Sequence, residues 1–162
     1  MQGKAVKDSQ VLMTEIVHPG DTNPLGTIFG GTVFKWIDMA AAMCAMRHTR
    51  SNVVTASIDA LDFLCPVKIG YFVILKASVN YTGKTSMEIG VRVESEHPIT
   101  GEVRLVAKSF LTFVSIDEHG KPKAVPAVIP QTEIEKKRYE MAQRRREHRV
   151  KFNKDKSNNS HK

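Results

Sequence analysis

The chain has 162 residues, of which 41% are hydrophobic and 25% are charged, a composition typical of one folded domain rather than of two domains or a disordered chain. Its net charge of +7 is concentrated at the end, since residues 131–162 carry 11 Lys and Arg against 5 Asp and Glu. The rest of the chain is close to neutral, which argues against a nucleic-acid-binding domain there.

Neither a membrane span nor a secretory signal is visible, so we expect a cytoplasmic protein. The longest apolar run, residues 39–46, is far shorter than the roughly 20 residues that a span needs, and the first ten residues lack an apolar core. Cys44 and Cys65 show neither metal-ligand spacing nor a disulfide framework, and we expect reduced, buried thiols. The scattered histidines predict no metal site.

The first elements expected along the chain are a strand and a polar loop. After residues 1–9, which we expect to be a flexible N-terminus, residues 11–17 mix β-branched and apolar with polar residues and predict a strand. Residues 18–26 read HPGDTNPLG, in which prolines, glycines, Asp and Asn supply turn chemistry. Such a loop can hold polar side chains in fixed positions.

An apolar helix follows this loop. From Gly30 or Gly31 to about Arg47 the residues are good helix formers, and apolar side chains cover nearly all sides. A helix that is apolar all round is normally buried. Only Lys35 and Asp38 interrupt the apolar pattern.

Four strand-like segments separated by short turns follow the helix, at residues 53–64, 71–82, 86–95 and 102–116. They lack the alternation of strands and helices that builds a parallel sheet. The order therefore predicts an α+β fold in which a curved antiparallel β-sheet wraps a long central helix. We place this domain at residues 10–130.

The last segment, residues 131–162, has a different character. Thr132 and Glu135 fit a capping box that opens a polar helix of about 15 residues. The Lys- and Asn-rich end beyond this helix is expected to be disordered. The arginine run at residues 144–146 is of a kind that usually faces solvent. We therefore predict a basic C-terminal helix with a disordered tail, and we do not expect it to bind nucleic acid.

The loop and the apolar helix carry chemically useful residues in the pattern NxxGxxxGGxxxxxxD. Gly30 and Gly31 at the helix start let another group approach the free backbone N–H donors, at the positive end of the helix dipole, which suits an oxyanion. Asn23 can hydrogen-bond the same oxygen or orient a water. Asp38 can act as general base or nucleophile, and burial would raise its pKa toward a working value. Together these groups predict acyl transfer.

The spacing along the helix separates these groups. Asp38 lies eight residues beyond Gly30, which is roughly 12 Å of helix rise and too far for its carboxylate to reach a carbonyl at the same helix N-terminus. If two copies pack by two-fold symmetry with antiparallel helices, each Asp38 can meet the glycines of its partner. We therefore expect a homodimer as the minimal active unit, with two identical sites across the interface.

Three segments together resemble the hotdog-fold acyl-CoA thioesterases, specifically the bacterial and cytosolic acyl-CoA thioester hydrolase group: HPGDTNPLGTIFGGTVFKWIDMA, DFLCPVKIG (62–70) and YTGKTSMEIGVRV (81–93). The resemblance covers about residues 10–130. It implies a helix wrapped by an antiparallel sheet, dimers that pair their sheets edge to edge and, in many members, a trimer of dimers that forms a hexamer. The implied reaction belongs to lipid metabolism and hydrolyses acyl-CoA thioesters to a free carboxylic acid and coenzyme A. Coenzyme A is then part of the substrate, and no bound cofactor is expected.

The resemblance also implies roles for individual residues. In similar enzymes catalysis uses an acidic residue at the place of Asp38, an amide at that of Asn23 and a backbone N–H at Gly30 or Gly31. Ser57 matches a position where some relatives have a catalytic hydroxyl and others do not. A tight turn offers backbone N–H groups and one cation to an anion, and the turn that contacts the phosphates of coenzyme A in relatives corresponds to Gly83, Lys84, Thr85 and Ser86.

Two alternatives stay open. The segment His18-Pro19-Gly20 is faintly similar to the histidine loop of hydroxyacyl-thioester dehydratases on the same fold, although His18 lies twenty residues before Asp38. The basic end would instead suit a non-catalytic module that binds acyl-CoA or nucleic acid. The sequence indicates neither the preferred acyl chain length nor whether Asp38 is a nucleophile or a general base.

Overall fold

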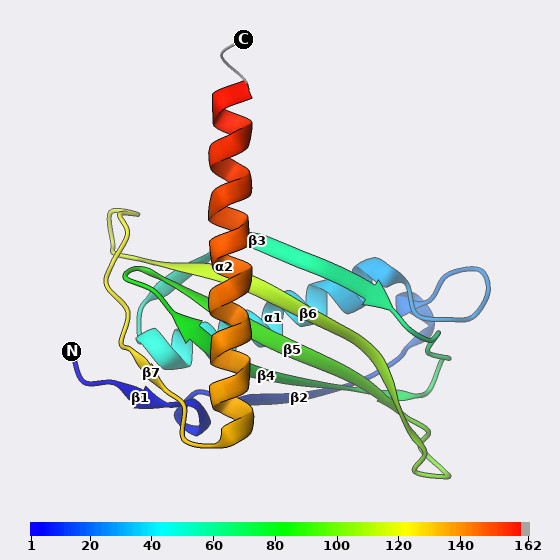
Figure 1. The fold of residues 1–162 in the computed structure, drawn as a ribbon. Helices are drawn as coiled ribbons and strands as arrows, with labels where there is room; N and C mark the ends of the chain where they lie inside the picture. Colours follow the sequence, from blue (N-terminus) through cyan, green and yellow to red (C-terminus); the bar gives the residue numbers. More distant parts are fainter. Residues whose placement is uncertain (160–162) are drawn as a thin grey trace.

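Two long helices lie on opposite faces of one antiparallel sheet (Figure 1). This computed structural model describes residues 1–159, with side chains up to Lys154. The elements along the chain are β1 (Lys4–Ala5), the 3₁₀ helix η1 (Val6–Asp8), β2 (Val11–Ile16), the 3₁₀ helix η2 (Pro19–Asp21), α1 (Gly30–Thr49), β3 (Asn52–Phe63), β4 (Phe72–Thr82), β5 (Ser86–Glu96), β6 (Val103–Ile116), β7 (Val128–Ile129) and α2 (Glu133–Asn159).

The main sheet has five strands in the order β2-β4-β5-β6-β3, and all neighbours are antiparallel. The expected strands are all present, with bounds that differ from the predicted ones by no more than one residue. Because α1 follows β2 and precedes β3, the helix crosses the inner face of the sheet and the two strands lie at opposite edges. The predicted α+β class and the wrapped central helix are confirmed.

Helix α1 is buried on one face only. The face toward the sheet carries fully buried side chains at helical spacing, namely Val33, Ile37, Ala41 and Cys44. The opposite face exposes apolar side chains that are 40 to 47% accessible, namely Phe34, Met39, Met43 and Met46. The expectation of a helix enclosed on all sides is therefore wrong for the single chain, because the sheet covers only the side that it faces. Likewise, Cys65 is half-buried rather than buried.

The N-terminal segment packs against the domain, which corrects the flexible end predicted for residues 1–9. Strand β1 pairs in parallel with β7, and Val6 and Ser9 are buried. The Lys4 Nζ donates a hydrogen bond of 2.7 Å to the carbonyl of His48, where a cation meets the negative end of the α1 dipole. A two-residue strand that pairs with a distant segment leaves no local pattern, so the sequence did not reveal it.

His48 links three parts of the chain at this junction. Its Nδ1 lies 3.1 Å from the Ser9 Oγ and its Nε2 lies 2.9 Å from the carbonyl oxygen of Pro126. Burial lowers the pKa of His48 below its ordinary value, which favours the neutral ring. In that form Ser9 donates to Nδ1 and Nε2–H donates to Pro126. The neutral ring therefore fastens the N-terminal segment and the segment before α2 to the end of α1.

Helix α2 is longer than predicted. The Glu135 N–H donates to the Thr132 Oγ1 at 3.2 Å and the Thr132 N–H donates to the Glu135 Oε2 at 3.0 Å, so the predicted capping box is confirmed. The helix continues to Asn159, since neither Gly nor Pro interrupts it. The prediction of a disordered tail is thus wrong up to this residue, and residues 160–162 lie outside the described part. Within that part, no helix is long and apolar enough to cross a membrane.

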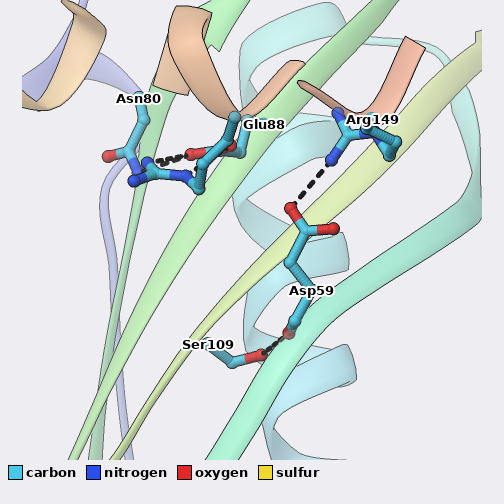
Figure 2. A network of polar contacts seen from close by, with 6 residues as sticks. Asp59, Asn80, Glu88, Ser109 and Arg149 are labelled. Carbon is cyan, nitrogen blue, oxygen red and sulfur yellow. Dashed lines mark hydrogen bonds and ion pairs between the residues drawn. The ribbon is translucent and has the colours of Figure 1, made fainter. Parts of the chain in front are cut away.

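Charged side chains fasten α2 to the outer face of the sheet (Figure 2). Arg145 donates to both carboxylate oxygens of Glu88, at 2.7 and 3.1 Å, and Glu88 is only 3% exposed. Arg149 pairs with Asp59 of β3 at 2.8 Å. The expectation that the run at residues 144–146 faces solvent is therefore wrong for Arg145, because a buried carboxylate requires a paired cation.

Replacing Arg145 by Met should lower the free energy of unfolding by about 2 to 3 kcal/mol, because the Glu88 carboxylate then stays buried without its cation. The matched control is Arg144→Met, at the exposed neighbouring position, where we expect a change below about 0.5 kcal/mol. Urea unfolding measures both changes. Equal effects of the two substitutions would show that the Arg145–Glu88 pair does not hold α2 in place.

Candidate active site

The loop before α1 is held by its own hydrogen bonds. The Asn23 Oδ1 accepts from the N–H groups of Leu25 at 3.0 Å and Thr27 at 3.3 Å, and the Asn23 Nδ2 donates to the Thr27 Oγ1 at 3.0 Å. Gly26 has a φ of +74°, a conformation that favours glycine. The Asn23 side chain thus braces its own turn, and its amide nitrogen has a second N–H that can serve another acceptor.

Helix α1 begins without a side-chain cap. Phe29 occupies the N-cap position and makes no side-chain capping bond, while its N–H donates to the carbonyl of Asp21 at 2.7 Å. Within the described residues, no acceptor is bonded to the N–H groups of Gly30 and Gly31, and the first N–H groups of a helix have no partner inside it. These donors can therefore receive an anion or a polarised carbonyl oxygen.

The two glycines differ in what surrounds them. A Cβ atom at Gly31 would lie 2.7 Å from the ring of Phe29, which is closer than a carbon atom can approach without a shift. A Cβ atom at Gly30 would lie 3.5 Å from the ring of Phe63, an ordinary contact. The Phe29 ring is 59% exposed and can move aside, so the fold of the single chain requires a glycine at neither position.

Asp38 is half-buried on the exposed side of α1 and accepts a hydrogen bond of 2.8 Å from the Thr55 Oγ1. Thr55 lies on the edge strand β3, where a bulge separates it from Ser57. It pairs in register with Phe113, whose ring is buried on the inner side of the sheet. Strict alternation along the strand would place Thr55 and Ser57 on the same face of the sheet. The bulge instead places the two side chains on opposite faces, and because the sequence does not show the bulge, Thr55 was not predicted as a site residue.

Ser57 lies on the other face of the sheet. Its cross-strand neighbour Thr112 pairs in register with Glu88, which binds Arg145 of α2. The sheet therefore stands between Ser57 and Asp38, which contradicts a catalytic role for the Ser57 hydroxyl beside this carboxylate. A one-residue bulge changes the face of every following side chain, and the amino-acid pattern carries no sign of it.

The donors and the carboxylate stay apart in one chain. Helix α1 is continuous from Gly30 to Thr49, so Asp38 lies roughly 12 Å of helix rise from Gly30. Gly30, Phe34 and Asp38 follow at four-residue intervals and share one side of the helix. The structure thus brings Asp38 to Thr55, but to neither Gly30 nor Asn23 of its own chain.

The turn between β4 and β5 is the predicted site for phosphate groups. The Gly83 N–H donates to the carbonyl of Ser86 at 2.8 Å, and Lys84 is exposed at the tip. Arg146 of α2 lies beside this turn, because its Nη2 would be 3.6 Å from a Cβ atom at Gly83. The structure thereby adds a second cation that the sequence analysis did not place, since α2 lies far from the turn in the chain.

A cavity of about 860 Å³ lies at the end of α1 opposite to the glycines. Its lining combines methionines with cationic side chains of the last helical turn, including Met43, Met46, Arg47 and Arg50. Asp117 and Glu118 line the same cavity, so its lining combines apolar side chains with charged groups of both signs. Among the described residues, no group of three or more His, Cys, Asp and Glu side chains could hold a metal ion.

Comparison with known proteins identifies the family. Residues 25–102 match the family model described as the Thioesterase superfamily. An uncharacterised acyl-CoA thioester hydrolase of Bacillus subtilis is 48% identical over 129 residues, which cover 80% of this chain and 75% of that protein. The chain belongs to the thioesterase superfamily. A cytosolic acyl coenzyme A thioester hydrolase of Mus musculus is 36% identical over 137 residues. The match covers 83% of this chain but only 36% of the mouse protein, which is longer.

Solved structures share the fold of this thioesterase-superfamily chain. The crystal structure of an apo-hexameric acyl-CoA thioesterase superposes with a TM-score of 0.90 and 52% identity, over 93% of this chain and 97% of the other. An acyl-CoA hydrolase from Staphylococcus aureus in complex with butyryl coenzyme A and coenzyme A has a TM-score of 0.88 and 40% identity, over 96% and 94%. That hydrolase has also been solved with an aspartate, an asparagine or a threonine replaced by alanine. The expected hotdog fold is confirmed.

Replacing Gly30 by Ala should leave stability unchanged or raise it by up to about 1 kcal/mol, because the added Cβ has room and the unfolded chain loses freedom. If the helix N-terminus receives a reacting oxygen, the same methyl group blocks the approach and thioester hydrolysis should fall at least about tenfold. Gly20→Ala is the matched control, since a Cβ atom there meets nothing within 4 Å. Thermal unfolding and thiol release test both variants, and full activity of Gly30→Ala would exclude this helix end from the site.

Proposed function

We propose that the protein hydrolyses acyl-CoA thioesters to a free carboxylic acid and coenzyme A, at sites that two chains share. The observation that carries this proposal is the hydrogen bond between Thr55 and Asp38, on the side of α1 that also carries Gly30. Among the described residues, no acceptor is bonded to the N–H groups of Gly30 and Gly31 at the start of this helix. A carboxylate and backbone donors are the groups that acyl transfer to water requires. The acyl-CoA hydrolases among its relatives support the substrate class.

The alanine variants of the Staphylococcus aureus hydrolase support the choice of residues. By their printed positions, the asparagine of that enzyme precedes the aspartate by 15 residues and the threonine follows the aspartate by 17. Asn23, Asp38 and Thr55 have the same two intervals. We therefore assign these three residues, together with the glycine pair, to the site.

A two-fold dimer would close the gap between the groups. When two α1 helices pack antiparallel and centred on Phe34, each Asp38 lies opposite Gly30 of its partner, because each residue is four positions from the centre. Phe34 is 40% exposed and begins the row of exposed apolar side chains on α1. Phe63 of β3 is 48% exposed and lies on the same side, because it pairs in register with the buried Ala107. Within the described residues, the outer edge of β3 is unpaired. An apolar surface beside an open strand edge favours association with a second copy.

The mechanism follows from this placement. The N–H groups of Gly30 and Gly31 in one subunit hold the thioester carbonyl oxygen, and Asp38 of the other subunit acts at the carbonyl carbon. As general base, Asp38 takes a proton from the attacking water, and the tetrahedral intermediate expels the thiolate of coenzyme A, which then takes up a proton. As nucleophile, the Asp38 carboxylate displaces the thiolate of coenzyme A to form a mixed anhydride, and water then hydrolyses the anhydride to the free acid and the Asp38 carboxylate. In both cases the hydrogen bond from Thr55 orients the carboxylate.

The proposal also assigns positions to the parts of the substrate away from the thioester. We place the phosphates of coenzyme A at residues 83–86, where Lys84 and Arg146 supply positive charge. Centred on Phe34, the antiparallel arrangement would bring the cavity at the end of α1, from Met43 to Arg50, beside residues 18–25 of the partner. A trimer of dimers is supported by the hexameric neighbour, and a cytoplasmic role in lipid metabolism is supported by the cytosolic relative.

The two alternative functions lose support from the geometry. Arg145 and Arg149 of the basic helix bind carboxylates of their own domain, so they are engaged rather than presented to nucleic acid. His18 lies exposed at the start of η2, and its backbone N–H, bonded to Asp21, only closes that turn. Hydrolysis therefore remains the function that the site supports best.

Replacing Asp38 by Asn should lower kcat for thioester hydrolysis at least about 100-fold, because the amide can neither accept the proton of water nor attack the carbonyl. Glu140→Gln, which removes an exposed carboxylate of α2 in the same way, is the matched control and should keep full activity. Thiol release from acyl-CoAs of increasing chain length measures both variants and also gives the chain-length preference. Equal rates for wild type and Asp38→Asn would remove Asp38 from the mechanism.

Replacing Thr55 by Val should lower kcat about tenfold with little change in KM, since the isosteric side chain keeps its volume but no longer orients the Asp38 carboxylate. Ser57→Ala should leave both constants unchanged, because Ser57 faces α2. Steady-state kinetics of the two variants distinguish the positions. A larger loss for Ser57→Ala than for Thr55→Val would restore Ser57 to the site and contradict the assignment made here.

A further inference from the structure

Helix α2 crosses the outer face of the sheet and contacts its strands in spatial order. Tyr139 packs against Tyr81 of β4. Arg145 pairs with Glu88 of β5 and lies over the ring of Phe110 of β6. Arg149 pairs with Asp59 of β3. The last of these strands, β3, is the edge of the sheet. The helix is therefore tied to its own domain up to the strand whose outer edge is free.

The helix continues beyond this edge. Figure 1 shows α2 extending past β3, and its end at Asn159 lies ten residues beyond Arg149. Strands lie about 4.8 Å apart and a helix rises 1.5 Å per residue, so α2 needs about three residues to pass one strand. Ten residues, or about 15 Å, therefore reach over the place of further strands that the single chain does not possess.

The side of α2 that faces the sheet also continues past the edge. Ala142, Arg145 and Arg149 face the sheet at helical spacing. Phe152 follows three residues after Arg149 on the same side, and it is 53% exposed, whereas Ala142 is 1% exposed. Phe152 thus stands where the helix would meet the next strand of a longer sheet.

Charge is complementary across the free edge. Asp62 of β3 is exposed. It lies on the outer face of the sheet, because it pairs in register with Lys108, and Lys108 lines a groove between the sheet and α2. The projecting end of α2 carries cationic residues that include Lys151 and Lys154. When two sheets meet at β3 around a two-fold axis, the basic end of each helix lies near Asp62 of the other β3, whereas Asp59 is already paired with Arg149 of its own chain.

We propose that the end of α2 beyond Arg149 is an interaction surface for a second copy of this chain, with Phe152 packed on the outer face of the partner's β3 and the lysines beside the partner's Asp62. The α2 helices of the two copies then lie across the joint between the two sheets, on the face opposite to α1. This inference rests on the proposed shared site, because that site requires the two chains to meet at β3.

The first experiment compares two aspartate substitutions by sedimentation velocity over a range of protein concentrations. Phe152→Asp should raise the dissociation constant of the dimer at least about tenfold, because it places a carboxylate in the contact. Val150→Asp is the matched control. Val150 is 43% exposed, but two helical residues turn it by roughly 200° to the solvent side, and we expect less than about a twofold change. Equal constants for the two variants would overturn the proposal.

A second measurement does not depend on the stability of a variant. A benzophenone amino acid in place of Phe152 should cross-link two subunits on illumination, and the attached peptide should fall in residues 52–63 or 103–116. The same probe in place of Gln143, on the solvent side, should give no such product. Cross-links confined to one chain would overturn the α2 contact while the shared site stands. A wild-type chain that stays monomeric at every concentration would overturn both.

Discussion

The one-sided burial of α1 is the constraint on which the rest of the structure depends. The sheet covers the side with Val33 and Ile37 and leaves uncovered the side with Gly30, Phe34 and Asp38. Because a helix is rigid, the N–H donors and the carboxylate are held roughly 12 Å apart and cannot approach each other within one chain. A reaction that needs both therefore needs a second chain, and the apolar side chains that favour association lie on the same side as the reacting groups. Under the proposed function, formation of the dimer and the reaction therefore depend on the same surface of α1.

The bulge in β3 adds the second element of the site. Without the extra residue, Thr55 would share a face with Ser57 and Asp59, on the side that α2 covers. With it, the Thr55 hydroxyl turns inward and bonds Asp38. Bulges are common at sheet edges and beside active sites, where they redirect single side chains. Here the redirected residue lies on the free edge, so the hydrogen bond that orients the carboxylate is formed beside the surface where the partner is proposed to bind.

Helix α2 explains the charge of the chain. A helix this basic would ordinarily suggest an anionic partner, yet its arginines satisfy carboxylates on the sheet, and Glu88 in particular is buried and needs Arg145. These pairs fix the direction of α2 across the strands, which carries the helix over the β3 edge and places Arg146 beside the turn at Gly83. One helix thereby contributes to domain stability, to the turn that is proposed to bind phosphates and to the surface at the open edge.

Strands β2 to β6, the beginning and approximate end of α1 and the capping box of α2 could be predicted from the sequence, because alternation, helix composition and capping are local patterns. The site pattern from Asn23 to Asp38 could also be predicted from the sequence. Its members lie on one loop and one helix, and the spacing of their residues resembles a known family. Only the tertiary structure decided that β1 pairs with β7, that α1 is open on one side, that Thr55 rather than Ser57 reaches Asp38, and that α2 docks on the sheet. Each of these depends on register or contact between segments distant in the chain, and such contacts are set by packing rather than by any local sequence pattern.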